Sequence, residues 1–205
     1  MTKIDRRSIL FASAGLALVG CSEANGAKGA TTGDMTLGKA NAPITVIEYA
    51  SMSCGHCATF NNNVFPQIKA KYIDTGQVRW VFREFITPPA ELAAAGALLA
   101  RCAGPTKYFS VVDAIFHGQE EMFRTGDMRG VLLRVAQSSG MTEAQFQACV
   151  TDEKAITAFN SRIEGYSKTD KITSTPTFLV NGKKVKEGEM SLAEFDAFIA
   201  AAKKK

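Results

Sequence analysis

Two cysteines, Cys54 and Cys57, are separated by two residues and follow closely after an apolar stretch of sequence. A cysteine at the start of a helix lies where unpaired backbone N–H groups and the positive end of the helix dipole favour a thiolate. The second cysteine lies one turn further on, within bonding distance of the first. His56, between them, can add a positive charge that lowers the pKa of Cys54. A lowered pKa stabilises the dithiol and makes the disulfide a stronger oxidant, so the pattern predicts dithiol–disulfide exchange.

Other uses of such a cysteine pair fit this sequence less well. A structural zinc site needs four ligands, and the remaining candidates, Cys102, Cys149 and His117, are isolated from one another along the chain. Covalent haem attachment requires a histidine directly after the second cysteine, where this chain has Ala58. A purely structural short-loop disulfide remains the alternative. The sequence therefore predicts no metal site and no cofactor, and His117 is interpreted as a helix-end residue.

Glu48 lies six residues before Cys54, in the middle of an apolar run with strand character. A buried carboxylate is costly unless it has a partner or a function. Desolvation would raise the proton affinity of Glu48, which could then exchange a proton with Cys57 during thiol–disulfide exchange. The alternative is that Glu48 points to solvent from an edge strand.

Thr175 and Pro176 precede a second apolar segment near the carboxyl end of the chain. A proline that enters a strand in this way suits a cis peptide bond. In that conformation the backbone of Thr175 would be free to pair with an extended substrate strand. An ordinary trans proline at the start of a strand is the alternative.

The elements around these residues follow from periodicity and end signals. Residues 44–50 are β-rich and almost continuously apolar, which is typical of a strand buried on both faces. A helix is expected over residues 54–74, ended by Gly76, and a second strand over residues 77–85. Strand, helix and strand in this order predict a βαβ unit with a parallel pair.

The strand signals are then replaced by a block of helices and return only at the end. Thr142 with Gln145, and Ser191 with Glu194, form capping boxes that mark helix starts. The dipeptide Asn181-Gly182 predicts a type I′ hairpin. Helices are expected over residues 90–103, 105–117, 128–138, 143–150, 152–167 and 192–202, and strands over residues 177–180 and 183–186.

Over residues 35–202 this order of motifs resembles the DsbA-like thiol:disulfide oxidoreductases. The resemblance implies an α/β structure, a thioredoxin fold with an inserted all-helical domain. Its parts would be residues 35–89 and 172–205, with the insertion over residues 90–171. It implies that Cys54 is the exposed sulfur, Cys57 the buried resolving one and His56 the residue that tunes the thiolate. Glu48 would be the buried acid, and Thr175 and Pro176 the cis-proline loop.

The resemblance further implies a periplasmic protein that introduces disulfides into reduced or misoxidised protein substrates, with a DsbB-type membrane redox partner. Three positions depart from the best-known members: Gly55 replaces proline, Asn61 replaces an acidic residue, and Thr175 replaces valine. These departures leave the oxidising strength open. The alternatives are therefore a disulfide reductase or isomerase of the same fold and, from another class, a non-catalytic peptide-binding module.

The amino-terminal residues are interpreted as a targeting signal. Basic residues precede an apolar run over residues 9–20, which at about 18 Å is too short to span a bilayer. Residues 1–20 are therefore predicted to be a signal peptide. The run ends at Cys21 in a sequence that resembles a lipoprotein lipobox, and Arg6-Arg7 resembles a twin-arginine export signal. We expect lipidation of Cys21, a linker over residues 21–34 and a membrane-anchored periplasmic protein; cleavage at another small-residue site is the alternative.

Composition limits the remaining possibilities. The 205 residues are 46% hydrophobic, as in globular proteins. Of the net charge of +4, the first twenty residues carry +2 and the last three lysines +3, so the body is close to neutral and nucleic-acid binding is not expected. Once Cys21, Cys54 and Cys57 are assigned, Cys102 and Cys149 remain, and in an exported protein they predict a structural disulfide. The alternative is two buried free thiols.

Overall fold

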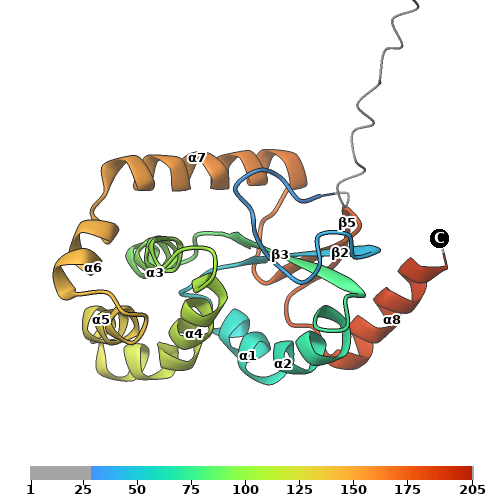
Figure 1. Cartoon of the computed structure of the whole chain (residues 1–205), viewed down its shortest axis with the longest axis horizontal. Helices are drawn as coiled ribbons and strands as arrows, with labels where there is room; N and C mark the ends of the chain where they lie inside the picture. Colours follow the sequence, from blue (N-terminus) through green and yellow to red (C-terminus); the bar gives the residue numbers. More distant parts are fainter. Residues whose placement is uncertain (1–28, 205) are drawn as a thin grey trace, which may run out of the picture.

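The computed structural model describes residues 29–204, which form a mixed five-stranded sheet with helices on both faces (Figure 1). The strand order is β1-β3-β2-β4-β5. The strands β2 and β3 are parallel, and the other neighbouring pairs are antiparallel. The strands are β1 (Met35–Leu37), β2 (Ile44–Ala50), β3 (Val78–Glu84), β4 (Thr177–Val180) and β5 (Lys183–Glu187).

Five helices, α3 to α7, are inserted in the chain between β3 and β4, and the last of them, α7, returns to lie beside the sheet. In Figure 1, α1 (Gly55–Asn63), α2 (Phe65–Ile68) and α8 (Leu192–Lys203) lie on one side of the sheet and α7 (Glu153–Asp170) lies on the other. The rest of the inserted block is α3 (Ala90–Cys102), α4 (Tyr108–Thr125), α5 (Met128–Ser138) and α6 (Glu143–Val150). The predicted α/β architecture, a thioredoxin fold with a helical insertion, is confirmed.

The middle strand β2 is buried along its whole length, which explains its nearly continuous apolar sequence. Ile44 and Val46 pack with α1 and α8 on one face. Ile47 and Tyr49 pack with Tyr166 of α7 on the other. Because β2 is buried against a hydrophobic core on each face, its carboxyl end is held in place, and so is the start of the turn that leads to Cys54.

Several element boundaries differ from the sequence prediction. The single helix expected over residues 54–74 is interrupted at Val64, and it continues as α2 and a π-helix, η1 (Lys69–Ile73). Pro66 explains the break, because it lacks an N–H and its ring excludes a continuous helix. The helix expected to end at residue 117 runs on to Thr125, where Gly126 adopts a left-handed φ of 76°. The strand β1 and the cis peptide bond at Pro88-Pro89 were not predicted.

Both predicted capping boxes are present, at the starts of α6 and α8. At the predicted hairpin, Asn181 and Gly182 have φ values of 48° and 78°, the signs that a type I′ turn requires. Cys102 at the end of α3 and Cys149 in α6 form a disulfide bond. Closing a loop of this length contributes about 4 kcal/mol in the chain-entropy model, before any strain.

At the end of the predicted linker, Ala30 packs against the core of the sheet, and Asp34 forms an ion pair with the buried Arg83. Thr31–Gly33, between them, are exposed. The predicted signal peptide, Cys21 and residues 22–28 lie outside the described residues. Among the residues that are described, no helix is long and apolar enough to cross a membrane.

Candidate active site

The two cysteines of the motif differ sharply in accessibility. Cys54 is the N-cap residue of α1 and is half-buried, and its sulfur accepts a hydrogen bond from the Cys57 N–H at 3.3 Å. Cys57 lies in the first turn of α1 and is 0% exposed. No acidic residue lies in that first turn to oppose a negative charge on the sulfur. Only Cys54 can therefore be reached by a second protein.

The electrostatic environment separates the two thiols further. A hydrogen bond from the Cys57 thiol, with smaller contributions from the Thr175 side chain and the backbone N–H groups of Cys57 and His56, lowers the pKa of Cys54 to about 6, against the opposing effect of burial. Burial, and next the neighbouring Cys54, raise the pKa of Cys57 well above its ordinary value. At pH 7 roughly nine-tenths of Cys54 is then thiolate, whereas Cys57 keeps its proton.

Glu48 lies directly upstream of this pair, in the central strand β2, and is 3% exposed. Its partners in register are apolar, Phe82 on β3 and Phe178 on β4. Desolvation by burial is the main reason that the pKa of Glu48 is raised to about 8, and the charge of Cys54 raises it further. The alternative of a solvent-facing residue on an edge strand is wrong. Glu48 is protonated at neutral pH and is coupled electrostatically to Cys57.

The Thr175–Pro176 peptide bond is cis, so the alternative of a trans proline is wrong. The Cys54 thiol donates to the carbonyl oxygen of Thr175 at 3.4 Å, which places this loop beside the reactive sulfur. The structure thus brings together residues from the two predicted parts of the thioredoxin fold, which are separated by 121 positions.

His56 points away from the protein interior and is 77% exposed. Its Nδ1 atom lies 2.5 Å from Oε1 of Glu189, and this contact is the main cause of a raised pKa of His56. Glu189 follows β5, in a turn that is tied to the cis-proline loop by a bond from the Gly188 N–H to the Pro176 carbonyl at 2.8 Å. Sequence reasoning missed Glu189 because nothing in its local pattern links it to a residue 133 positions away.

Two further side chains support the active-site turn and were also missed. The buried Gln119 in α4 donates from Nε2 to the Met52 carbonyl at 3.0 Å, and Ser53 Oγ donates to the Thr87 carbonyl at 2.7 Å. They fix the segment between β2 and α1. Asn61, which replaces an acidic residue of the family pattern, donates to the carboxylate of Asp113 at 3.0 Å.

The remaining candidates lie apart from the site. Cys102 and Cys149 are bonded to each other. The interpretation of His117 as a helix-end residue is wrong, because α4 runs on to Thr125; His117 is exposed, with its Nδ1 atom 2.9 Å from the Asp113 backbone carbonyl. Within residues 29–204, no group of three or more His, Cys, Asp and Glu side chains could hold a metal ion.

The comparisons with known proteins agree with this geometry. A family model described as thioredoxin matches residues 30–201. The crystal structure of Wolbachia pipientis alpha-DsbA1 is similar to the protein with a TM-score of 0.75 and 30% identity, over 84% of this chain and 92% of that one. BdbD from Bacillus subtilis gives a TM-score of 0.71 and 25% identity, over 84% and 94% of the two chains.

A curated relative from Rickettsia bellii, whose name assigns it provisionally to the protein-disulfide oxidoreductases, is 35% identical over 150 residues. The match covers 73% of this chain but only 57% of the relative. The chain therefore spans a little over half the length of this curated relative. With the family match over residues 30–201 and the shared architecture, the chain belongs to the thioredoxin family and, within it, to the DsbA-like thiol–disulfide oxidoreductases.

Proposed function

We propose that the protein introduces disulfide bonds into reduced proteins through the Cys54–Cys57 pair. The observation that carries this proposal is the contrast between the two thiols. Cys54 is accessible and has a pKa of about 6, whereas Cys57 is buried and its pKa is raised. A stable Cys54 thiolate favours the reduced protein, so its disulfide tends to be passed on to a substrate.

The oxidised protein would react in two steps. A substrate thiolate attacks the Cys54 sulfur, a new disulfide forms between them, and the bond between Cys54 and Cys57 breaks. The sulfur of Cys57 leaves as a thiolate and takes a proton from Glu48, which is mostly protonated at neutral pH because its pKa is about 8. A second substrate thiolate then attacks the substrate sulfur and releases Cys54 as its stable thiolate. The substrate loses two electrons and the protein gains them.

The cis-proline loop would hold the substrate during these steps. The Thr175 carbonyl lies at the reactive sulfur, so an extended segment that pairs with the Thr175 backbone would present its own sulfur to Cys54. Backbone pairing is independent of side chains, which suits reduced or misoxidised proteins of varied sequence as substrates.

Trapping of intermediates tests the exchange reaction. A Cys57→Ser variant should accumulate mixed disulfides with protein substrates at Cys54, because the resolving thiol is gone. A Cys54→Ser variant should accumulate none. If neither variant formed adducts, the protein would be a peptide-binding module whose cysteine pair is a structural bond.

The reduction potential of the Cys54–Cys57 disulfide determines whether the protein donates disulfides to its substrates or reduces them. Equilibration with glutathione should give a value above about −150 mV if the protein donates disulfides. A value near about −250 mV, typical of thioredoxin, would instead assign it as a reductase. Gly55 between the cysteines keeps the reductase and isomerase alternatives relevant.

We also propose that residues 1–20 export the protein to the periplasm and that a lipid on Cys21 anchors it to a membrane. The disulfide between Cys102 and Cys149 supports an oxidising compartment. A DsbB-type membrane protein would then accept electrons from reduced Cys54 and Cys57, and membranes that contain it should reoxidise the reduced protein. On fractionation of cells, the protein should be found with membranes and a Cys21→Ser variant should not. Retention of that variant in the membrane fraction would contradict the anchor.

A further inference from the structure

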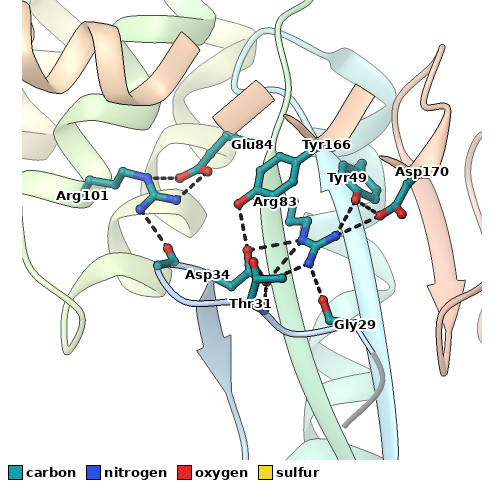
Figure 2. Close-up of polar contacts among 10 residues, drawn as sticks. Gly29, Thr31, Asp34, Tyr49, Arg83, Glu84, Arg101, Tyr166 and Asp170 are labelled. Carbon is teal, nitrogen blue, oxygen red and sulfur yellow. Dashed lines mark hydrogen bonds and ion pairs between the residues drawn. The ribbon is translucent and has the colours of Figure 1, made fainter. Parts of the chain in front are cut away.

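Arg83, in β3, takes no part in the chemistry described above, yet its side chain is only 4% exposed. Figure 2 shows acceptors from residues 29–34, β2 and α7 converging on its guanidinium. Nη2 donates to Asp34 at 2.9 Å and to the Gly29 carbonyl, and Nη1 donates to Tyr49 Oη at 2.6 Å and Asp170 Oδ2 at 2.9 Å. Nε also donates to the Asp34 carboxylate, at 3.3 Å to each oxygen. Each nitrogen of Arg83 is therefore engaged.

Aromatic rings enclose this ion cluster. The guanidinium carbon of Arg83 lies 4.6 Å from the ring centroid of Tyr166 and 5.6 Å from that of Tyr49. The Tyr166 hydroxyl donates to Asp34 Oδ1 at 2.8 Å. A planar, forked donor stacked on aromatic rings is specific to arginine, so lysine cannot reproduce these contacts.

The cluster is connected to both ends of the cis-proline loop, residues 171–176. Asp170, which Arg83 binds, is the last residue of α7 and directly precedes the loop. Thr177 directly follows it and pairs with Tyr49, which in turn pairs with Arg83 on the next strand. Thr177 Oγ1 also donates to the carbonyl of Ser174, inside the loop, at 2.7 Å. Arg83, Tyr49 and Thr177 thus form one row across the sheet, and this row attaches both ends of the loop. Arg83 binds Asp170 at the start of the loop, and Tyr49 pairs with Thr177 at its end.

We propose that Arg83 is a positioning residue that places Thr175 against Cys54 for exchange with peptide substrates; this rests on the proposed function. The loop is short and has no regular secondary structure, so the attachment of its two ends determines where the Thr175 carbonyl lies. A peptide that pairs with the Thr175 backbone requires that placement. A small thiol that attacks Cys54 directly does not.

The experiment compares two reductants of the oxidised protein, a reduced cysteine-containing peptide and dithiothreitol. Arg83→Lys should lower the second-order rate constant for the peptide about tenfold, because a small displacement of a positioning group is costly to the rate. The rate constant for dithiothreitol should stay within about twofold of the wild type, since a small thiol attacks Cys54 without pairing with the Thr175 backbone.

Arg101→Lys is the matched control. Arg101 is also largely buried, binds the Glu84 carboxylate at 2.6 and 2.7 Å, and donates to the Gly33 carbonyl at 3.1 Å. It joins α3 to the sheet rather than the cis-proline loop (Figure 2). Its replacement should leave the ratio of the two rate constants unchanged.

The positioning role would be overturned if the ratio of the peptide rate constant to the dithiothreitol rate constant were unchanged in Arg83→Lys. It would also be overturned if Arg101→Lys lowered this ratio equally. If Arg83→Lys does not fold, Asp170→Asn weakens the contacts of Asp170 with Arg83 and with the Tyr49 hydroxyl, next to the loop, and should lower the same ratio; an unchanged ratio there would also overturn the positioning role. A wild type that fails to react with the peptide at all would contradict the proposed function instead.

Discussion

Replacing Glu48 by glutamine is expected to remove a pH-dependent loss of stability. Burial raises the pKa of Glu48 from 4.5 to about 8, so the folded protein holds a proton that the unfolded chain releases. The raised pKa of Glu48 lowers the free energy of unfolding. This loss is absent below pH 4.5, grows as the pH rises, and is complete above pH 8. At 1.36 kcal/mol for each pKa unit, it amounts to about 3 kcal/mol at pH 7 and increases by about 4 kcal/mol between pH 5 and pH 8.5.

Urea unfolding of the oxidised protein at pH 5, 7 and 8.5 measures the main part of this effect, the desolvation of Glu48, because Cys54 and Cys57 are uncharged and do not titrate when bonded. Relative to the wild type, Glu48→Gln should become steadily more stable as the pH rises. The control is Glu84→Gln, whose carboxylate is also buried but binds Arg101 and the Tyr108 hydroxyl. That variant should be less stable, because it leaves a buried guanidinium without its partner. A pH-independent difference between Glu48→Gln and the wild type would contradict the raised pKa.

The same variant should slow exchange. Without the carboxyl proton of Glu48, the Cys57 sulfur must leave as a buried thiolate, so the rate of reduction by a peptide is expected to fall at least about tenfold. Stability and rate thus change in opposite directions, which separates a functional role of Glu48 from a structural one.

The lowered pKa of Cys54 should produce the second large effect, on the reactivity of its thiol. In the reduced protein, absorbance at 240 nm is expected to titrate with a midpoint near pH 6, the pKa that the surrounding hydrogen bonds produce. At pH 7 this gives Cys54 about ninety times the thiolate fraction of a thiol with the ordinary pKa of 9.0. Iodoacetamide should therefore modify Cys54 first, and Cys57 only after unfolding.

Two variants test the origin of the lowered pKa. Cys57→Ala removes the thiol that contributes most to it, and Thr175→Val removes the smaller contribution of the hydroxyl, so both should move the pKa of Cys54 upward, the first by more. A midpoint near pH 9 in the wild type, or one unchanged by Cys57→Ala, would be inconsistent with this environment. Because the pKa is lowered on folding, its contribution to the stability of the reduced protein is complete above pH 9 and is lost as the pH falls through 6.

Much of this site could be predicted from sequence because its signals are local. The spacing of Cys54 and Cys57, the carboxylate in an apolar strand and the Thr175-Pro176 dipeptide each have a physical meaning within a few residues. Capping boxes and the Asn181-Gly182 turn depend in the same way on short-range contacts. Helix ends were less accurate, as the break at Val64 shows, because tertiary packing determines how far a helix runs.

Local sequence patterns are enough to identify the residues that could carry redox chemistry and most of the strands and helices that position them. The partners that surround these residues depend on the three-dimensional fold. Glu189 reaches His56 across 133 positions, and Asp34, Tyr49 and Asp170 meet at Arg83 across separations of 34 to 87. The contacts at Arg83 form because the sheet and α7 bury polar groups together, and a buried polar group must find a partner wherever the fold supplies one. That requirement acts in three dimensions and leaves no periodic pattern along the chain.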